Sequence, residues 1–177
     1  MRRRGTLSLT WSDILADPRN PKGVTLCVLY RIAHGTSYWP KWAFVPRVII
    51  VVCYKFLTEY ILGTEIHWRA KIGPSLRIYH GYGLVVHSAA VLGQDCVLRH
   101  GVTIGSKVKN EVLSSPILGN SIDVGTGAII IGGIYVGDGA RLGAGSVVLH
   151  DVPPGATVVG NPGRIVMSAR VVKEDTN

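Results

Sequence analysis

An aliphatic residue recurs at every sixth position, with two interruptions, between Ile66 and Val148 of this 177-residue chain. Six residues suit one flat strand and one turn, and three such units close a triangular coil whose interior the aliphatic side chains fill. A single coil cannot bury that interior, so stacked coils supply the core. The pattern therefore predicts a mainly β fold, a parallel β-helix. The recurring positions are Ile66, Ile72, Ile78, Leu84, Leu92, Leu98, Ile104, Leu118, Val124, Ile130, Val136, Leu142 and Val148.

Glycine and small residues accompany the repeat. Gly often follows the aliphatic residue, as at Gly105 and Gly125, and can turn a corner at a φ that other residues avoid. The repeat slips by two residues between Leu84 and Leu92, and the polar segment 105–117 (GSKVKNEVLSSPI) interrupts it. We expect that segment to leave one corner of the solenoid as a loop, a common place for a binding site.

The N-terminal third has a different texture. Residues 23–34 and 43–62 read as two helices, and Pro40 and Pro46 are expected to break the chain between them. Gly63 suits the stop of the second helix, whereas residues 1–22 carry no clear pattern. We therefore divide the chain into a helical N-terminal region (1–64), a hexapeptide-repeat domain (65–166) and a C-terminal tail (167–177).

The charge distribution argues against a nucleic-acid-binding module. Residues 1–77 hold twelve Lys and Arg against four Asp and Glu, whereas residues 78–177 hold seven of each. The repeat region thus carries no basic surplus with which to bind phosphates.

The cysteines and the N-terminus point to a cytoplasmic protein. Cys27, Cys53 and Cys96 show neither a zinc spacing nor a disulfide framework, which suits a reducing compartment. No apolar run directly follows the basic start, so a signal peptide is not expected. The apolar stretch 48–62 is too short for a membrane span and contains Lys55 and Glu59.

Residues 65–166 resemble the serine O-acetyltransferases and, more closely, the colanic-acid-type exopolysaccharide O-acetyltransferases among the hexapeptide-repeat acyltransferases. The resemblance rests on ordered segments with matching spacings: EIHWRAKIG (65–73), HGYG (80–83), VTIG (102–105), GDGARLGAGSVV (137–148), VPPGA (152–156) and GNPGRIV (160–166). It implies a left-handed β-helix, a homotrimer and acetyl-CoA as the acyl donor. From the residues themselves, no resident metal is expected. Histidines at 67, 80 and 100 lack a dedicated metal-ligand pattern.

His80 and Glu65 are the expected catalytic pair. By resemblance, His80 stands at the family's catalytic histidine, and an imidazole can take a hydroxyl proton at neutral pH. The family has an acid fifteen residues before this base, usually Asp, and Glu65 lies at that distance. Its carboxylate would fix the imidazole tautomer and stabilise the imidazolium. No serine nucleophile elbow or Cys–His pair is present, so we expect direct attack of the hydroxyl on the thioester.

The family pattern also indicates where coenzyme A would bind. Backbone amides and basic side chains suit its diphosphate and 3′-phosphate. The positions implied by the resemblance are Gly105, Ser106, Thr126, Gly127, Arg141 and Arg164.

The acceptor positions depart from the serine enzymes. Those relatives have an acid just before the base and an Arg-His pair before the proline of the interrupting loop; here the residues are Tyr79, Ser114 and Ser115. Losing these charged groups should weaken selection of a zwitterion. We therefore predict a sugar acceptor in polysaccharide or glycoconjugate biosynthesis. Tyr79, Tyr82 and His100 are further candidates for contacting it.

Other functions stay open. The acceptor can instead be serine, homoserine or a natural-product hydroxyl, and the β-helix can be a non-catalytic scaffold or a metal-bearing relative. The basic, apolar N-terminal helices also suit a peripheral contact with the inner face of an anionic membrane, although packing within the trimer would equally cover them.

Overall fold

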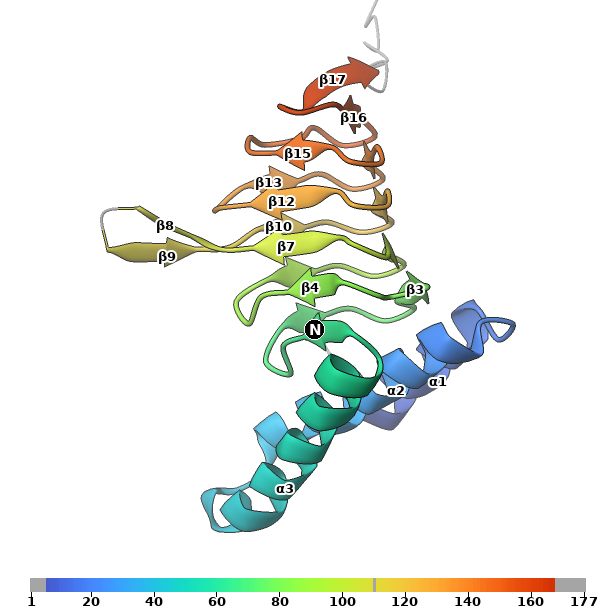
Figure 1. Cartoon of the computed structure of the whole chain (residues 1–177), viewed down its shortest axis with the longest axis vertical. Coiled ribbons are helices and arrows are strands. Elements are labelled where there is room, and N and C mark those ends of the chain that lie inside the picture. Colours follow the sequence, from blue (N-terminus) through green and yellow to red (C-terminus); the bar gives the residue numbers. More distant parts are fainter. Residues whose placement is uncertain (1–5, 110, 168–177) are drawn as a thin grey trace, which may run out of the picture.

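The computed structural model describes residues 6–109 and 111–167, which form a stack of triangular coils standing on a group of helices (Figure 1). The stack is a left-handed parallel β-helix of about five turns, as predicted. Three sheets form its faces, and the chain visits them in the repeating order A, B, C. We call the turns from sheet C to sheet A the C–A corners, and those from A to B the A–B corners.

The strands are short and pair in parallel along the prism. Sheet A contains β1 (Thr64–Ile66), β4 (Leu84–Val86), β7 (Thr103–Gly105), β12 (Ile129–Ile131) and β15 (Val147–Val148). Sheet B contains β2 (Lys71–Ile72), β5 (Val91–Leu92), β10 (Ile117–Leu118) and β13 (Tyr135–Val136). Sheet C contains β3 (Arg77–Tyr79), β6 (Val97–Arg99), β11 (Asp123–Val124), β14 (Arg141–Leu142), β16 (Thr157–Val159) and the antiparallel β17 (Arg164–Met167).

The predicted inward positions form the core. All thirteen aliphatic residues of the repeat are buried, and Cys96 is buried in the same core. The two-residue slip has a simple geometric cause. Ile66 pairs with Val86, twenty positions on, whereas Val86 pairs with Ile104, eighteen positions on. The first coil is therefore two residues longer than the next, and β4 turns both Leu84 and Val86 inward.

Helices precede the prism, as predicted, but their bounds differ. They are α1 (Thr6–Ala16), α2 (Pro21–Gly35), the 3-10 turns η1 (Thr36–Tyr38) and η2 (Lys41–Ala43), α3 (Phe44–Lys55) and the π-helix η3 (Phe56–Ile61). The expectation that Pro46 breaks the chain was wrong. Pro46 lies in the first turn of α3, where its missing N–H has no helical partner to lose. Gly63, at φ 62°, follows the last helical turn as expected.

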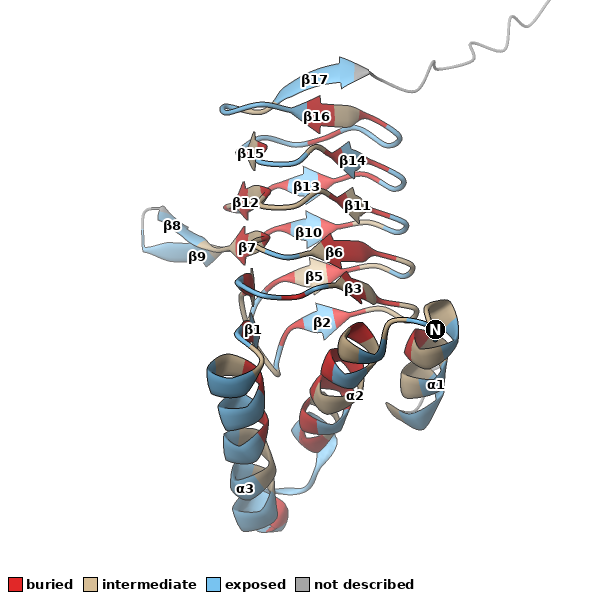
Figure 2. Ribbon diagram, turned by 45° about the vertical axis from the view of Figure 1, so that its right-hand side comes forward, coloured by how far each residue is buried: buried red, intermediate tan, exposed pale blue. Residues whose placement is uncertain are grey.

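Helix α2 closes the open end of the prism. Arg31, in this helix, is buried, as is its ion-pair partner Asp13 on α1. Arg31 also donates to the carbonyl oxygens of Ile72 and Gly73, and Leu76 N–H donates to Asp13. Figure 2 shows the buried side of α2 turned to the first coil. Solenoids need such a cap because the last coil would otherwise expose its apolar interior.

The interrupting segment leaves an A–B corner, but as a hairpin rather than as an irregular loop. Strands β8 (Lys107–Lys109) and β9 (Val112–Ser114) pair antiparallel and project from the prism (Figure 1). The polar composition of segment 105–117 gave no sign of this hairpin. Its two strands pair with each other and need no buried apolar face, so no hydrophobic pattern marks them. Of the predicted tail 167–177, all but Met167 lies outside the described residues.

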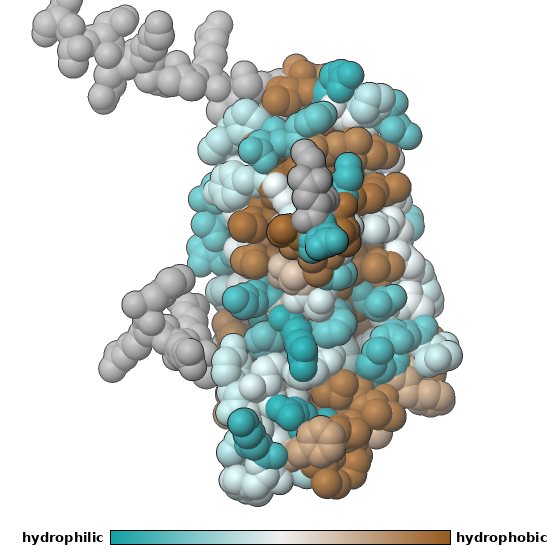
Figure 3. Space-filling view, turned by 90° about the vertical axis from the view of Figure 1, so that its left-hand side faces the viewer, coloured by the Kyte–Doolittle hydropathy of each residue, from teal (hydrophilic) through white to brown (hydrophobic). Residues whose placement is uncertain are grey.

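Helix α3 contacts the rest of the chain along one edge only. Its other sides are apolar and exposed, and they form part of the brown area at the lower end of Figure 3. Within the described residues, no helix is both long enough and apolar enough to cross a membrane.

Candidate active site

His80 occupies the first C–A corner, directly after β3. Ile78 and Val86 bracket this corner and are eight positions apart, whereas their partners Leu98 and Ile104 on the next coil are six apart. The two extra residues of the first coil are thus in the corner that carries His80. His80 is exposed and has φ 66°, the left-handed region that non-glycine residues seldom adopt. Strained residues of this kind concentrate at functional sites.

His100 lies beside His80 on the next coil. The two rings are 5.7 Å apart between centroids and meet edge to face. Above them the C–A corners stack in register: Gly101 N–H donates to Tyr82, Gly127 N–H to His100 and Gly145 N–H to Thr126, all at the carbonyl oxygens. A Cβ added at Gly127 or Gly145 would meet no atom within 4 Å. We call this open column of turns (100–101, 126–127, 144–145) the corner strip.

Glu65 approaches the same corner from sheet A. It is exposed in β1 and pairs with Val85, just after the His80 corner. Its neighbour Thr64 donates a 2.7 Å hydrogen bond to the carbonyl oxygen of Gly81. Among the described residues, Glu65 and His80 form neither a hydrogen bond nor an ion pair with each other. The chain therefore brings the two residues to one corner without joining their side chains.

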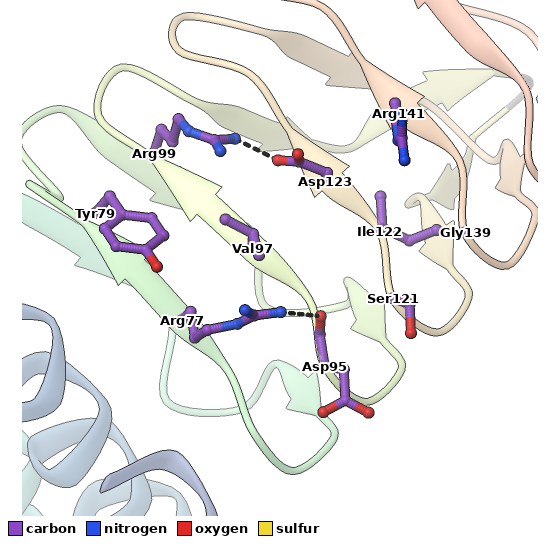
Figure 4. Close-up of a pocket in the computed structure, with 10 residues that line it drawn as sticks. All are labelled: Arg77, Tyr79, Asp95, Val97, Arg99, Ser121, Ile122, Asp123, Gly139 and Arg141. Carbon is purple, nitrogen blue, oxygen red and sulfur yellow. Dashed lines mark hydrogen bonds and ion pairs between the residues drawn. The ribbon is translucent and has the colours of Figure 1, made fainter. Parts of the chain in front are cut away.

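Tyr79 and Arg141 lie on the outer face of sheet C, Tyr79 directly before His80 and Arg141 three strands farther along the sheet. They line a cavity of about 470 Å³ together with Arg77, Arg99 and Asp123 (Figure 4). Arg99 is paired with Asp123 and lies 5.9 Å from the centre of the Tyr79 ring. Arg141 therefore lies on the same face of sheet C as Tyr79, and not in the corner strip. This face carries three guanidinium groups and suits an anionic group.

Four residues predicted for the site lie on the other side of sheet A from His80, where its strands end and the hairpin leaves the A–B corner. Gly105 ends β7, and Ser106 follows it where the hairpin leaves the prism. Ser114 ends β9 and donates to the Lys107 carbonyl oxygen. Ser115 lies 3.1 Å from Nδ1 of His87. Within one chain, these residues are not brought to the His80 corner.

Two other observations complete the site. Arg164 is exposed in β17, at the far end of the prism from the helices, and among the described residues its side chain donates only to its own neighbour, at the Gly163 carbonyl oxygen. Sequence reasoning missed Lys22, whose Nζ lies over the ring of Tyr82. Its place in a helix fifty-eight residues before His80 gave no spacing from which to find it.

The two buried thiols are poorly suited to act as nucleophiles. Burial raises the pKa of both Cys27 and Cys96, which disfavours their nucleophilic thiolate forms. The part of the chain that the structure describes holds no group of three or more His, Cys, Asp or Glu residues placed to bind a metal ion.

Comparisons with known proteins point to one group. No family model matches the chain. A serine acetyltransferase of Synechococcus elongatus is 38% identical over 86% of the chain, which spans 63% of that protein. The putative colanic acid biosynthesis acetyltransferase WcaB of Escherichia coli K12 is 37% identical over 86% of the chain and 96% of its own length.

Solved structures agree. The soybean serine acetyltransferase apoenzyme superposes with a TM-score of 0.77 at 34% identity, covering 92% of this chain and 69% of that one. A serine acetyltransferase in complex with CoA gives 0.77 at 30% identity, covering 91% and 70%. These likenesses extend over the helices as well as the prism. The chain belongs to the serine acetyltransferase family of acetyltransferases.

Proposed function

We propose that this protein is an acetyl-CoA-dependent O-acetyltransferase with His80 as its general base. The single observation that carries the proposal is the exposed, left-handed His80 at the foot of the open corner strip. Nε2 or Nδ1 of the imidazole takes the proton as the acceptor oxygen attacks the thioester carbonyl. The C–S bond then breaks, and the imidazolium returns the proton to the CoA sulfur. A backbone N–H of a glycine corner would hold the oxyanion.

Glu65 is proposed as the partner that orients His80. Its strand is tied through Thr64 to Gly81, the residue after His80, so the carboxylate and the imidazole belong to the same corner. The longer side chain of Glu compared with Asp suits a carboxylate that starts from the neighbouring strand.

The corner strip is the proposed path of the CoA pantetheine arm. Thr126 and Gly127 lie in it directly above His100, where the backbone is open to a close approach. Gly105 and Ser106 lie at the other edge of sheet A, and Arg141 and Arg164 provide charges farther along the prism for phosphates. A related structure was solved as a complex with CoA, which supports this donor.

For the acceptor, the comparisons support the serine alternative better than the sugar predicted first. Serine acetyltransferases dominate the relatives, and one structure is a complex with serine. We therefore propose a serine-type hydroxyl as the leading acceptor, with homoserine in the same class.

A sugar is the second candidate, and specific residues favour it. Tyr79, Ser114 and Ser115 replace charged groups that the resemblance assigns to gripping serine, and the colanic-acid relative matches this chain over nearly its whole length. An aromatic face and hydroxyls suit a sugar ring better than a zwitterion.

A homotrimer would complete the acceptor side. Ser114 and Ser115 lie across sheet A from His80 in one chain, so a neighbouring subunit is needed to bring such residues to the catalytic corner. Sedimentation equilibrium should give three times the chain mass of 19.1 kDa; a monomer with full activity would remove this part of the proposal.

Helix α3 is proposed to rest on an anionic membrane surface. Its exposed apolar side chains include Phe44, Val48, Ile49 and Val52, and η3 continues them with Phe56 and Tyr60. Trp42 just before it is 85% exposed, and Lys41 adds a charge that anionic lipids attract. The protein should float with phosphatidylserine-containing vesicles and not with phosphatidylcholine ones. Recovery in the soluble fraction from both would mean that other subunits cover this face.

The acceptor is tested with a panel. Thiol release from acetyl-CoA is measured with serine, homoserine and nucleotide- or lipid-linked sugars, for the wild type and Tyr79→Asp. Efficient turnover of serine establishes the leading acceptor. Turnover of a sugar with little serine activity, together with a gain of serine activity in Tyr79→Asp, establishes the second candidate. An absence of turnover with every hydroxyl would contradict the proposed function.

A further inference from the structure

Lys22, near the start of α2, makes an unusual contact with the catalytic corner. Its Nζ is shielded from solvent and has no hydrogen-bond acceptor in the described part of the chain. The ion pairs among the described residues do not include it. What it does meet is the ring of Tyr82, 2.8 Å from Nζ to the centroid. A shielded ammonium without an anion needs another source of stabilisation, and the face of an aromatic ring provides one.

Helix α2 is held firmly against this corner, so the position of Lys22 is well determined. Asn20 caps the helix and donates through Nδ2 to the carbonyl oxygen of Ile78, in β3. A Cβ on Gly23 would come within 2.2 Å of that same oxygen, so the helix approaches the strand as closely as glycine permits. The ammonium is thus delivered to Tyr82 by a rigid element, not by a loop.

Tyr82 is two residues after His80 and presents a free surface. Its ring lies against Gly63, where a Cβ would be 3.4 Å from Cδ1, yet the residue is 62% exposed. Lys22 therefore occupies one face of the ring and leaves other parts of it open to solvent next to the exposed His80. An aromatic ring held in this way is a ready contact surface for a bound molecule.

The position of the Tyr82 ring relative to the corner strip indicates whether the ring contacts the acyl donor or the acceptor. The corner strip, proposed for the CoA arm, runs from His100 toward β17. The backbone of Tyr82 lies at the foot of that strip, where its carbonyl oxygen accepts from Gly101, whereas its ring lies against Gly63 and Lys22, toward the helices. The reacting hydroxyl must reach His80 from a side that the donor does not occupy, and the Tyr82 surface lies on that side.

We propose that Lys22 is a positioning residue for the acceptor: it holds the Tyr82 ring from α2, and the ring contacts the acceptor beside His80. The proposal rests on the proposed acetyl transfer at His80 but not on the identity of the acceptor. Removing the ammonium frees the ring to rotate, and removing the ring deletes the contact. Both changes should weaken acceptor binding and leave acetyl-CoA binding intact.

The test compares Lys22→Met, Lys22→Arg, Tyr82→Leu and Tyr82→Phe by initial rates against acceptor and acetyl-CoA, using the acceptor that the wild type turns over best. Lys22→Met and Tyr82→Leu should raise the acceptor KM by about five- to thirtyfold, the range expected for a shielded cation–π contact. The KM for acetyl-CoA should stay within about twofold. Lys22→Arg and Tyr82→Phe keep the cation and the ring and should stay near wild type.

Two further variants sharpen the result. Lys71→Met, on an exposed lysine of β2, is the matched control and should change nothing. The double variant of Lys22→Met and Tyr82→Leu should be no worse than Tyr82→Leu alone, because both act through one ring. Circular dichroism checks folding, and if Lys22→Met fails to fold, Tyr82→Leu on the exposed ring carries the test.

The outcomes separate the two proposals. An active wild type whose acceptor KM is unchanged by Lys22→Met and Tyr82→Leu, or whose acetyl-CoA KM rises equally, overturns the role of Lys22 alone. A wild type that turns over no acceptor overturns the proposed function, and this inference with it.

Discussion

Replacing Arg31 by Met should destabilise the protein severely, because this arginine is the centre of the cap on the prism. Arg31 is 1% exposed and donates to both carboxylate oxygens of Asp13, at 2.7 and 3.2 Å, and to the Ile72 and Gly73 carbonyl oxygens. Methionine fills similar space but leaves the buried carboxylate with the Leu76 N–H as its partner. Breaking a buried ion pair from one side costs about 3–5 kcal/mol in the free energy of unfolding.

Urea unfolding followed by far-UV circular dichroism, at fixed protein concentration, measures this loss. The matched control is Lys55→Met, which removes the ion pair with Glu59 on the surface and should cost less than about 1 kcal/mol. Replacing both partners, with Arg31→Met and Asp13→Leu, should recover part of the loss because no unpaired charge remains. A loss below about 1 kcal/mol for Arg31→Met, or a double variant less stable than the single one, would refute this reasoning.

Three further predictions test the core, the donor path and the pH response. Leu98→Ala, at a fully buried repeat position, should lower the free energy of unfolding by about 2–5 kcal/mol in urea titrations, and a loss under 1 kcal/mol would contradict the stacked core. Gly127→Leu should raise the KM for acetyl-CoA at least tenfold, whereas Gly139→Leu, at nearly the same φ and with equally open surroundings on another corner, should change it less than threefold; equal effects would mean that backbone strain alone is responsible. Burial lowers the pKa of His34 below its ordinary value of 6.5, so the unfolded chain binds its proton more readily, and stability should fall as the pH drops below about 6.5. Urea titrations from pH 7.5 to 5.5 should show a shallower fall for His34→Gln, and an identical slope would contradict this assignment.

The repeat made the prism predictable because its inward positions are set by a strict period. The period did not show, however, which corner holds the two extra residues of the first coil. The slip between Leu84 and Leu92 shows that the chain gains two residues, but only the pairing of Ile78 with Leu98 and of Val86 with Ile104 places them in the His80 corner. A spacing argument finds residues of one coil and fails for contacts between distant elements. The Arg31–Asp13 cap and the Lys22–Tyr82 contact are of that second kind, since packing of α1 and α2 on the prism creates them.

In the candidate site, too, positions set by the repeat could be predicted, and contacts that depend on irregular segments or side chains could not. His80, His100, Thr126 and Gly127, which the resemblance indicated, lie along one line of corners, because a solenoid repeats its corners at nearly constant intervals. The resemblance could not show that Gly105, Ser114 and Ser115 lie across sheet A, because the hairpin breaks the period. It also gave no sign that Glu65 reaches the corner without contacting His80, since that depends on side-chain torsions.

Direct transfer of acetyl from CoA to a hydroxyl, with His80 as the general base, is tested most directly by thiol release by the wild type and His80→Ala. Each is assayed with saturating acetyl-CoA and the best acceptor of the panel, and CoA binding is measured by calorimetry. We predict that His80→Ala lowers kcat by about 10²–10⁴ while CoA affinity stays within about threefold. Comparable kcat values for the two proteins would contradict the account.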